Sequence, residues 1–219
     1  ITLSHSPHDE RTRQAATYII YYERRGTAMK KVLTMWSDDH VNEEETRILR
    51  QPCADLPIPL DGEARKSVKT LVDAFLERND ASGLAAPQIG ICKKIIIFRN
   101  RGFTRDGASD GTWTKKDVEV LINPRLTQQR GNQVILSEGC LSCPDIKVDI
   151  ARYPEIKIRG FDMHGQKVSK RYVDFIARIV QHEMDHLEGK MIVDYDEGAI
   201  FVPKKKRGFF ENLFQNKSA

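Results

Sequence analysis

The chain has 219 residues, 40% hydrophobic and 30% charged, which is enough for one domain with a buried core. Its formal net charge of +4, from 35 basic and 31 acidic residues, does not imply a dedicated nucleic-acid surface, and we expect no specific DNA partner. No run of residues has the length and apolar character of a membrane span. Four unevenly spaced cysteines are more typical of a reduced intracellular protein than of a disulfide scaffold.

The N-terminal part of the chain contains few recognisable elements. Residues 1–45 are polar and mixed in charge, so we expect an extension of unknown role. A short helix is predicted over residues 43–50, and apolar side chains at helical spacing predict an amphipathic helix over residues 61–78. Residues 79–92 are rich in small side chains and by themselves favour a turn before a strand. Alternatively, the amide of Gln88 in this loop donates a hydrogen bond to an oxyanion.

The middle of the chain has the composition of β-strands. The second of the predicted strands is expected to end at Asn123 and Pro124, and the last two form a hairpin. The predicted strands are residues 94–98, 118–122, 133–136, 156–161 and 167–173. Because they precede one further helix, the predicted fold class is α+β.

The helix expected after these strands carries an HExxH motif. Asp174 is its expected N-cap and Gly189 its end. His182 and His186 are four residues apart, so they project from one helical face and can hold one metal ion. Glu183 is offset by one residue, which suits a carboxylate that stays off the metal and takes the proton of a metal-bound water. The motif therefore predicts a metal-assisted hydrolase.

A third metal ligand is needed, because catalytic sites normally have three protein ligands and one open position. Cys140 is our candidate, since a thiolate completes the set and Gly139 lets the backbone bend close to the metal. Cys143 allows another interpretation, in which the two cysteines form a redox pair or half of a zinc knuckle. We favour the first, because the chain has no second Cys-x-x-Cys and Pro144 suggests that Cys143 is a small buried side chain.

A metalloprotease is the alternative among metal hydrolases. The extended motif of these enzymes continues beyond a glycine, here Gly189, to a third histidine. Position 192 is Ile192, so the pattern breaks at its last ligand.

Three stretches of the sequence belong together. They are Gly-Leu-Ala-Ala-Pro-Gln at residues 83–88, Glu-Gly-Cys-Leu-Ser at residues 138–142 and Gln-His-Glu-Met-Asp-His at residues 181–186. In this order and spacing they resemble the signature motifs of the peptide deformylase family. The resemblance extends from Arg47 to Tyr195, which implies a catalytic domain over residues 46–196 and a basic tail over residues 197–219. Ala81 and Ser82 depart from the family's pattern, which bears on substrate preference more than on activity.

The resemblance implies removal of the N-formyl group from the formylmethionine of nascent polypeptides, with release of formate. Carried over to this sequence, Cys140, His182 and His186 would hold one divalent ion, natively Fe²⁺, which Zn²⁺, Ni²⁺ or Co²⁺ can replace. Glu183 would act as general base and acid. The fold implied is a central HExxH helix enclosed by mixed or antiparallel sheets.

Further residues are expected around the metal. Gln88 and the backbone N–H of Leu141 would stabilise the oxyanion formed on the formyl carbonyl. Glu138 would pair with Arg152, unless the two are unrelated surface charges. The remaining candidates would bind the substrate's backbone or its methionine side chain, although core packing explains the last three equally well: Gly83, Leu136, Phe175 and Ile179.

Partners and location follow from the same resemblance. N-formylmethionyl peptides are the expected substrates, in the bacterial cytoplasm or, in a eukaryote, an organelle. The basic run at residues 204–207 suggests a contact with the ribosome near the exit tunnel, although a solvated tail is the simpler interpretation. A metal-stabilised binding protein without turnover is the alternative function. Glu183 and Gln88 favour the hydrolase, because a purely structural metal site needs neither.

Overall fold

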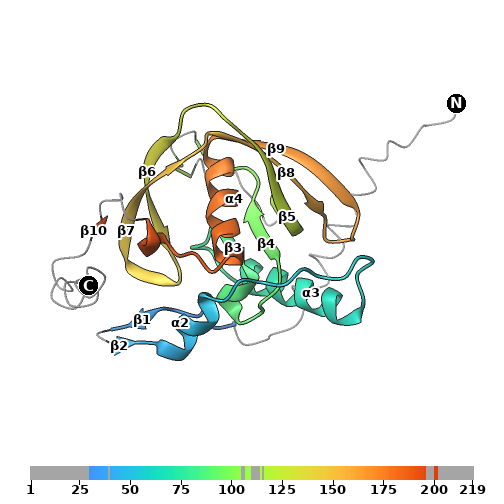
Figure 1. Ribbon diagram of the computed structural model, residues 1–219, viewed down its shortest axis with the longest axis horizontal. Coiled ribbons are helices and arrows are strands. Elements are labelled where there is room, and N and C mark those ends of the chain that lie inside the picture. The colour runs from blue at the N-terminus through green and yellow to red at the C-terminus, as the bar shows by residue number, and fades with distance from the viewer. Residues whose placement is uncertain are drawn as a thin grey trace, which may run out of the picture.

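Two antiparallel sheets flank one helix in the computed structural model, which describes residues 30–38, 40–104, 107–109, 114, 116–195 and 200–201 (Figure 1). The larger sheet has the strand order β3 (Gly83–Ala85), β4 (Ile95–Arg99), β5 (Val118–Arg130), β8 (Glu155–Phe161) and β9 (Lys167–Val173). The smaller has the order β10 (Ile200–Phe201), β7 (Cys143–Arg152) and β6 (Val134–Cys140). The remaining elements are β1 (Trp36–Ser37), β2 (His40–Val41), α2 (Glu43–Leu49), α3 (Gly62–Leu76), α4 (Asp174–Leu187) and the 3₁₀ turns η1 (Ala86–Ile89) and η2 (Ile192–Asp194).

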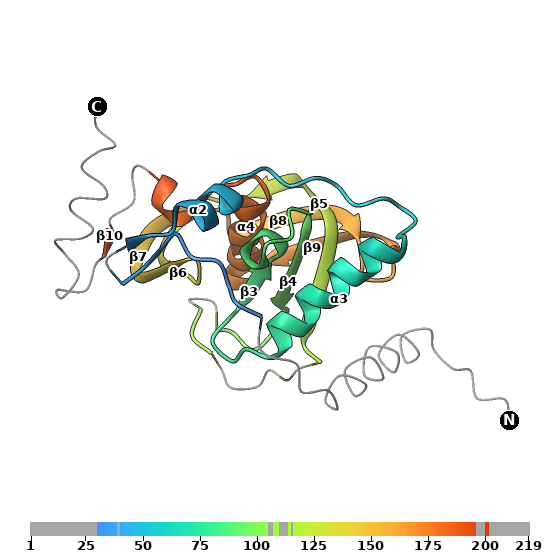
Figure 2. The same cartoon turned by 90° about the horizontal axis from the view of Figure 1, so that it is seen from below.

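Helix α4 lies between the two sheets, and α3 runs along the other face of the larger sheet (Figures 1 and 2). This arrangement follows from the alternation of side chains along a strand. In β5, Val120 and Ile122 pack in the apolar cluster that contains the buried side of α3, whereas Leu121 packs in the cluster of α4. All five residues of β4 are buried, because helices cover both of its faces.

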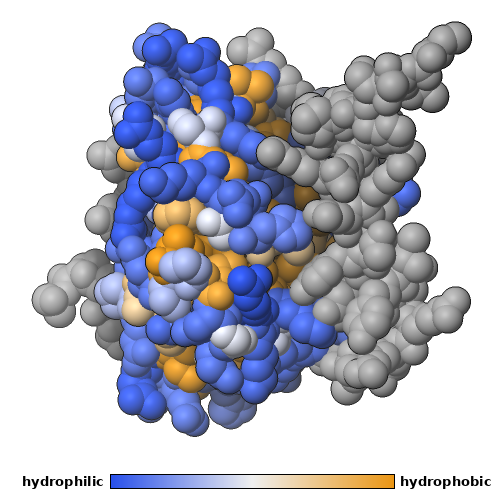
Figure 3. Space-filling view, turned by 90° about the vertical axis from the view of Figure 1, so that its right-hand side faces the viewer, coloured by the Kyte–Doolittle hydropathy of each residue, from blue (hydrophilic) through white to orange (hydrophobic). Residues whose placement is uncertain are grey.

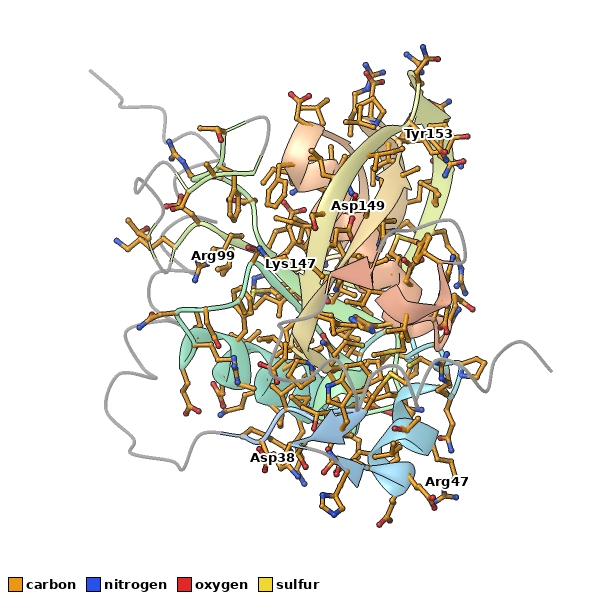
Figure 4. All side chains as sticks on the ribbon, turned by 90° about the vertical axis from the view of Figure 1, so that its left-hand side faces the viewer. Asp38, Arg47, Arg99, Lys147, Asp149 and Tyr153 are labelled. Carbon is orange, nitrogen blue, oxygen red and sulfur yellow. The ribbon has the colours of Figure 1, made fainter. Side chains whose placement is uncertain are left out.

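The smaller sheet shows the same alternation on one buried face. Ile146, Val148 and Ile150 of β7 are buried in a third apolar cluster, against which Cys140 packs. Lys147 and Asp149 point outward between them, as Figure 4 shows from the left-hand side of Figure 1. Strand β7 thus supports β6, which carries the predicted cysteine ligand.

Most predicted elements are confirmed. Helices α2 and α3 lie where the periodicity placed them, and the side chain of Asp61 caps α3 by accepting from the Ala64 N–H at 2.8 Å. Strands β8 and β9 form the predicted hairpin. The α+β class and the enclosure of the HExxH helix by sheets, here antiparallel, are also confirmed.

Two strand predictions were wrong. Strand β5 does not end at Pro124 but continues to Arg130, because the pairing with β8 shifts register between Ile122 and Arg125, and the proline sits in this bulge. Residues 83–85 form the short edge strand β3 rather than a turn, and η1 follows it directly. Strand β7 was not predicted, although Ile146, Val148 and Ile150 alternate with polar residues as a half-buried strand requires.

The start of α4 also differs by one residue from the prediction. Val173 is the N-cap and Asp174 is the first helical residue, because the chain passes straight from β9 into the helix and the Asp174 N–H donates to the Pro154 carbonyl. Gly189 ends the helix as predicted, with φ of +73° and Arg50 packed where a Cβ would lie.

Parts of the predicted extension and tail, residues 1–29 and 202–219, lie outside the described residues. The basic run at residues 204–207 is among them. In the part of the chain that is described, no helix combines the length and the apolar character that crossing a membrane requires.

Candidate active site

The three predicted metal ligands come together at the centre of the fold. Cys140 ends β6, and His182 and His186 lie one turn apart on α4. One ligand atom from each residue lies within 4.8 Å of the other two, and Cys140 Sγ is 3.3 Å from His186 Nε2. A cluster of one thiol and two imidazoles is a typical set of donors for a divalent transition metal.

A buried carboxylate fixes the orientation of His182. The Nδ1 of His182 lies 2.9 Å from Glu138 Oε2, so Nδ1 is the donor and Nε2 is left for the ligand cluster. Burial alone raises the pKa of Glu138, but hydrogen bonds from His182 and Arg152 outweigh it and lower this pKa to about 2. Glu138 is therefore charged at neutral pH.

Two arginines hold Glu138 in place. Arg152 donates to both carboxylate oxygens at 2.6 and 2.9 Å, which confirms that the predicted pair is in contact. Arg178 donates to the same carboxylate at 2.5 Å and was not predicted. Arg152 also donates to Asp185 at 2.8 Å and to the Tyr195 hydroxyl at 3.0 Å. Both guanidinium groups are buried, so the network is shielded from solvent screening.

Cys143 contacts the ligand Cys140 from the next strand. The two residues are register partners across the turn between β6 and β7. A hydrogen bond from Cys143 holds the pKa of Cys140 well below its usual range, whereas burial raises the pKa of Cys143. Cys143 thus stays a protonated donor to the Cys140 thiolate, and it is completely buried as predicted. The three-residue donor cluster does not include it, which disfavours the zinc-knuckle interpretation, and the two cysteines are not joined by a disulfide.

Glu183 lies against the edge strand β3. Its side chain is 4% exposed, and burial raises its pKa to about 7. A Cβ added to Gly83 would come within 2.8 Å of Glu183 Cδ, so the glycine leaves the space that the carboxylate occupies. The Oε2 atom of Glu183 is buried and accepts no hydrogen bond from the described residues. A buried carboxylate of this kind is available to accept a proton.

The amide of Gln88 is fixed at both ends. Its Oε1 accepts from the Ala85 N–H at 2.8 Å, so its NH₂ group points to the cluster, where Nε2 donates to Ser142 Oγ at 3.2 Å. Nε2 also lies 3.9 Å from Cys140 Sγ. The strand β3 and the turn η1 together place this side chain, which is 2% exposed.

A cavity of about 430 Å³ opens onto the cluster. Apart from metal ligands, it is lined by most of the predicted site residues: Gly83, Gln88, Glu138, Leu141, Phe175, Ile179 and Glu183. Leu136 instead lines a neighbouring cavity of about 460 Å³. Phe175 and Arg178 line both cavities and so form the wall between them.

Sequence reasoning missed Arg178, Ser142 and Asp185. Arg178 precedes His182 by four residues, so both occupy one face of α4, and a cation on an otherwise apolar face was a readable sign of a buried partner. Ser142 and Asp185 stand inside the recognised motifs, but their contacts depend on Gln88 and Arg152, which come from other elements.

Comparison with known proteins agrees with this geometry. The family model described as polypeptide deformylase matches residues 39–199. A peptide deformylase of Synechocystis is 32% identical over 167 residues, which cover 74% of this chain and 82% of that protein. The chain belongs to the polypeptide deformylase family. Its activity is that of the family, hydrolysis of the N-terminal formyl group with release of formate.

Solved structures support the same fold for the family domain. A class I type b peptide deformylase from Acinetobacter baumannii superposes with a TM-score of 0.61 at 27% identity, over 77% of this chain and 99% of that one. The enzyme of Thermotoga maritima gives a TM-score of 0.60 at 26% identity, over 77% and 97% of the two chains. The cluster of Cys140, His182 and His186 is thus the metal site of a deformylase.

Proposed function

We propose that Glu183 is the general base of the deformylation and then its general acid. It accepts the proton of the attacking water and passes it to the nitrogen of the departing amine. The observation that carries this proposal is the burial of Glu183 beside the ligand cluster, with a pKa raised to about 7. A group with this pKa both accepts and releases a proton at neutral pH.

We further propose Fe²⁺ as the native ion. The donors fit, because one thiolate and two imidazoles suit Fe²⁺ as well as Zn²⁺, Co²⁺ or Ni²⁺, and three protein ligands leave a position open. Such an ion supplies Lewis acidity toward the formyl carbonyl and toward water. Glu138 holds Nδ1 of His182, which leaves Nε2 as the atom that would bind the ion.

Gln88 and Leu141 are proposed to stabilise the oxyanion. The NH₂ group of Gln88 is directed into the site because the Ala85 N–H occupies its oxygen. Leu141 lies in the turn between β6 and β7 and lines the same cavity. A side-chain donor and the Leu141 N–H, both fixed before the substrate arrives, suit a charge that develops on the formyl oxygen.

The substrate is proposed to lie between two strand edges. β3 is the edge strand of the larger sheet and β6 that of the smaller, and residues of both line the cavity. An extended peptide can pair with either edge, as in strand addition. Phe175 and Ile179 offer an apolar wall for the first side chain. An Acinetobacter baumannii deformylase that is 28% identical over 76% of this chain is described as bound to Met-Ala-Ser.

The experiment is formate release from N-formyl-Met-Ala-Ser by the full chain, purified anaerobically and assayed with its metal content measured. Glu183→Gln should lower kcat at least ~100-fold and keep the metal, because positioned acid–base groups contribute about that much. Glu188→Gln is the matched control, since Glu188 follows α4 directly but is 62% exposed. A Glu183→Gln protein that keeps its rate would contradict the assigned role.

A contact with the ribosome is proposed for the basic run at residues 204–207, which lies outside the described residues. Positive charge close to a nascent-chain exit would attract ribosomal RNA. Deletion of residues 204–219 should reduce co-sedimentation with ribosomes and leave formate release unchanged. Equal co-sedimentation of the two proteins would exclude this contact.

A further inference from the structure

Six cations share one face of the larger sheet, and we call this surface the basic face. It is the face of β5, β8 and β9 that points away from α4. Along β8 and β9, Ile156, Ile158 and Tyr172 alternate with the cations and pack in the cluster of α4. Direct register partners across these strands lie on the same face. The six cations of the basic face are Arg125, Arg130, Lys157, Arg159, Lys167 and Arg171.

Few acids offset these cations. Glu155 lies on the same face and is 3.3 Å from Arg171 and 3.7 Å from Arg130. Asp55 pairs with Arg125 at 2.6 Å. Among the described residues, no acid pairs with the other three cations of the face: Lys157, Arg159 and Lys167. The small net charge of the whole chain therefore conceals an uneven distribution.

Two of the cross-strand pairs on the basic face join like charges. Arg125 of β5 is directly opposite Arg159 of β8, and Lys157 of β8 is directly opposite Arg171 of β9. Like charges in this relation repel and destabilise a sheet. Asp55 and Glu155 offset part of this repulsion through Arg125 and Arg171. An anion with several charges that binds across the three strands relieves the remainder. The arrangement thus costs stability in the free protein and favours a polyanionic partner.

The spacing of the cations selects the kind of polyanion. Lys157 and Arg159 are two residues apart on one strand, so they are separated by roughly 7 Å, and neighbouring strands add cations at about 4.8 Å. A linear chain of phosphates can contact successive members of such a grid. An isolated phosphate would engage only one or two of them.

A hollow at one end of the basic face adds an aromatic ring. It has a volume of about 440 Å³, and Phe161 lies in it beside Arg159 and Lys167. Asp55, the partner of Arg125, also lines the hollow, and one side of Phe161 packs against the cluster of α3. Where its atoms are coloured, the side of the molecule seen from the right of Figure 1 is mainly hydrophilic, with apolar side chains gathered near the middle of the view (Figure 3). Cations together with an aromatic side chain are the usual means of binding single-stranded nucleic acid, in which phosphates meet the cations and a base stacks on the ring.

We propose that the basic face binds single-stranded RNA through its phosphates, without regard to base sequence. RNA is favoured over an anionic membrane because Phe161 lies within the hollow and is half-buried, whereas membrane surfaces usually take up protruding aromatic side chains. Helix α4 and the metal ligands lie on the opposite side of the sheet. Bound RNA therefore leaves the active-site cavity open to a peptide.

The test is fluorescence anisotropy with a labelled 20-nucleotide poly(U) RNA, titrated with the full chain at several salt concentrations. The variant Lys157→Gln/Arg159→Gln removes two cations of the basic face. The control Lys147→Gln/Arg47→Gln removes the same two residue types from exposed positions on the side of the molecule shown in Figure 4. Formate release is measured on all three proteins, so that damage to the fold is recognised.

The wild type should bind RNA, and a plot of log K against the logarithm of the salt concentration should fall with a slope of about 0.7 for each phosphate neutralised. The basic-face variant should lose ~10-fold in affinity, and its salt slope should be shallower by roughly 1.4. The control should match the wild type, and formate release should be unchanged throughout. The proposal is overturned by absent RNA binding, by equal losses in both variants, by no loss in the basic-face variant, or by tighter binding to phosphatidylserine vesicles than to RNA.

Discussion

Gly83 and Glu183 lie so close together that no side chain at residue 83 is compatible with the present position of the carboxylate. A Cβ there would fall within 2.8 Å of both Cγ and Cδ of Glu183. The contact joins the edge strand β3 to α4, which connects the first recognised motif to the third. The position of the proposed base thus depends on a residue 100 positions away in the sequence.

Gly83→Ala should therefore displace Glu183 without removing any catalytic group. We expect kcat for N-formyl-Met-Ala-Ser to fall on the order of 100-fold, the contribution of a positioned base, with metal content unchanged. Gly62→Ala is the control, because a Cβ at Gly62 meets nothing within 4 Å. Normal turnover by Gly83→Ala would show that Glu183 does not need its observed position.

Glu138 is the point at which the buried charges of the site meet. Glu138→Gln removes the negative charge shared by His182, Arg152 and Arg178, and leaves two buried guanidinium groups with less compensation. We expect the free energy of unfolding to fall by about 3–5 kcal/mol. Metal affinity should weaken roughly 10- to 100-fold, since His182 loses the acceptor that orients it. Denaturant unfolding and competition with a chelator measure the two effects.

The matched control for this change is Glu155→Gln. Glu155 also pairs with two arginines, Arg130 and Arg171, but these are more than half exposed. Because exposed ion pairs contribute about 0–1 kcal/mol, its loss should be small and metal affinity should not change. Similar losses in both variants would show that the buried ion pairs of Glu138 contribute no more stability than the exposed pairs of Glu155.

The sequence predicted those parts of the fold in which one local pattern decides the structure. The periodicity of α3 and the hairpin of β8 and β9 are of this kind. The continuation of β5 through Pro124 was not predictable locally, because a proline normally ends pairing and only the partner strand shows the bulge that accommodates it. Strand β7 was readable from the alternation of its apolar and polar side chains, but Pro144, its second residue, is of a type that rarely stands inside a strand.

The residues of the site likewise differ in whether a local pattern predicted them. His182, His186 and Glu183 followed from motif spacing, and Cys140 followed from the need for a third ligand, because metal chemistry restricts which residue types can stand there. The role of Arg178 did not follow, since its contact with Glu138 joins α4 to β6 and exists only in the folded chain. Leu136 was a candidate for the substrate pocket, with core packing as an equal alternative, and it lines the cavity on the other side of Phe175.

Gln88→Ala should separate oxyanion stabilisation from metal binding. Removal of one oxyanion donor typically costs ~100- to 1000-fold in kcat. Gln88 should not ligate the metal, because its oxygen already accepts from the Ala85 N–H and its NH₂ group is a donor. We therefore expect a large loss of formate release with normal metal content. Ser142→Ala, which removes only the hydroxyl that accepts from Gln88, should cost less than ~10-fold. Loss of metal in Gln88→Ala would indicate a structural role instead.

The raised pKa of Glu183 predicts how the metal-free protein responds to pH. Burial raises this pKa from its ordinary value of 4.5 to about 7, so folding favours the protonated carboxyl. The related stability is fully present below about pH 4.5 and is lost as pH rises through 7. The Glu183→Gln side chain cannot ionise, so in chelated protein this variant should be more stable than the wild type at pH 8. Its gain in the free energy of unfolding should be larger at pH 8 than at pH 5 by roughly 2–3 kcal/mol. Urea unfolding at the two pH values measures this difference, with the exposed Glu188→Gln as a control that should show none. A gain that is equal at both pH values would mean that the Glu183 carboxyl does not titrate in this range.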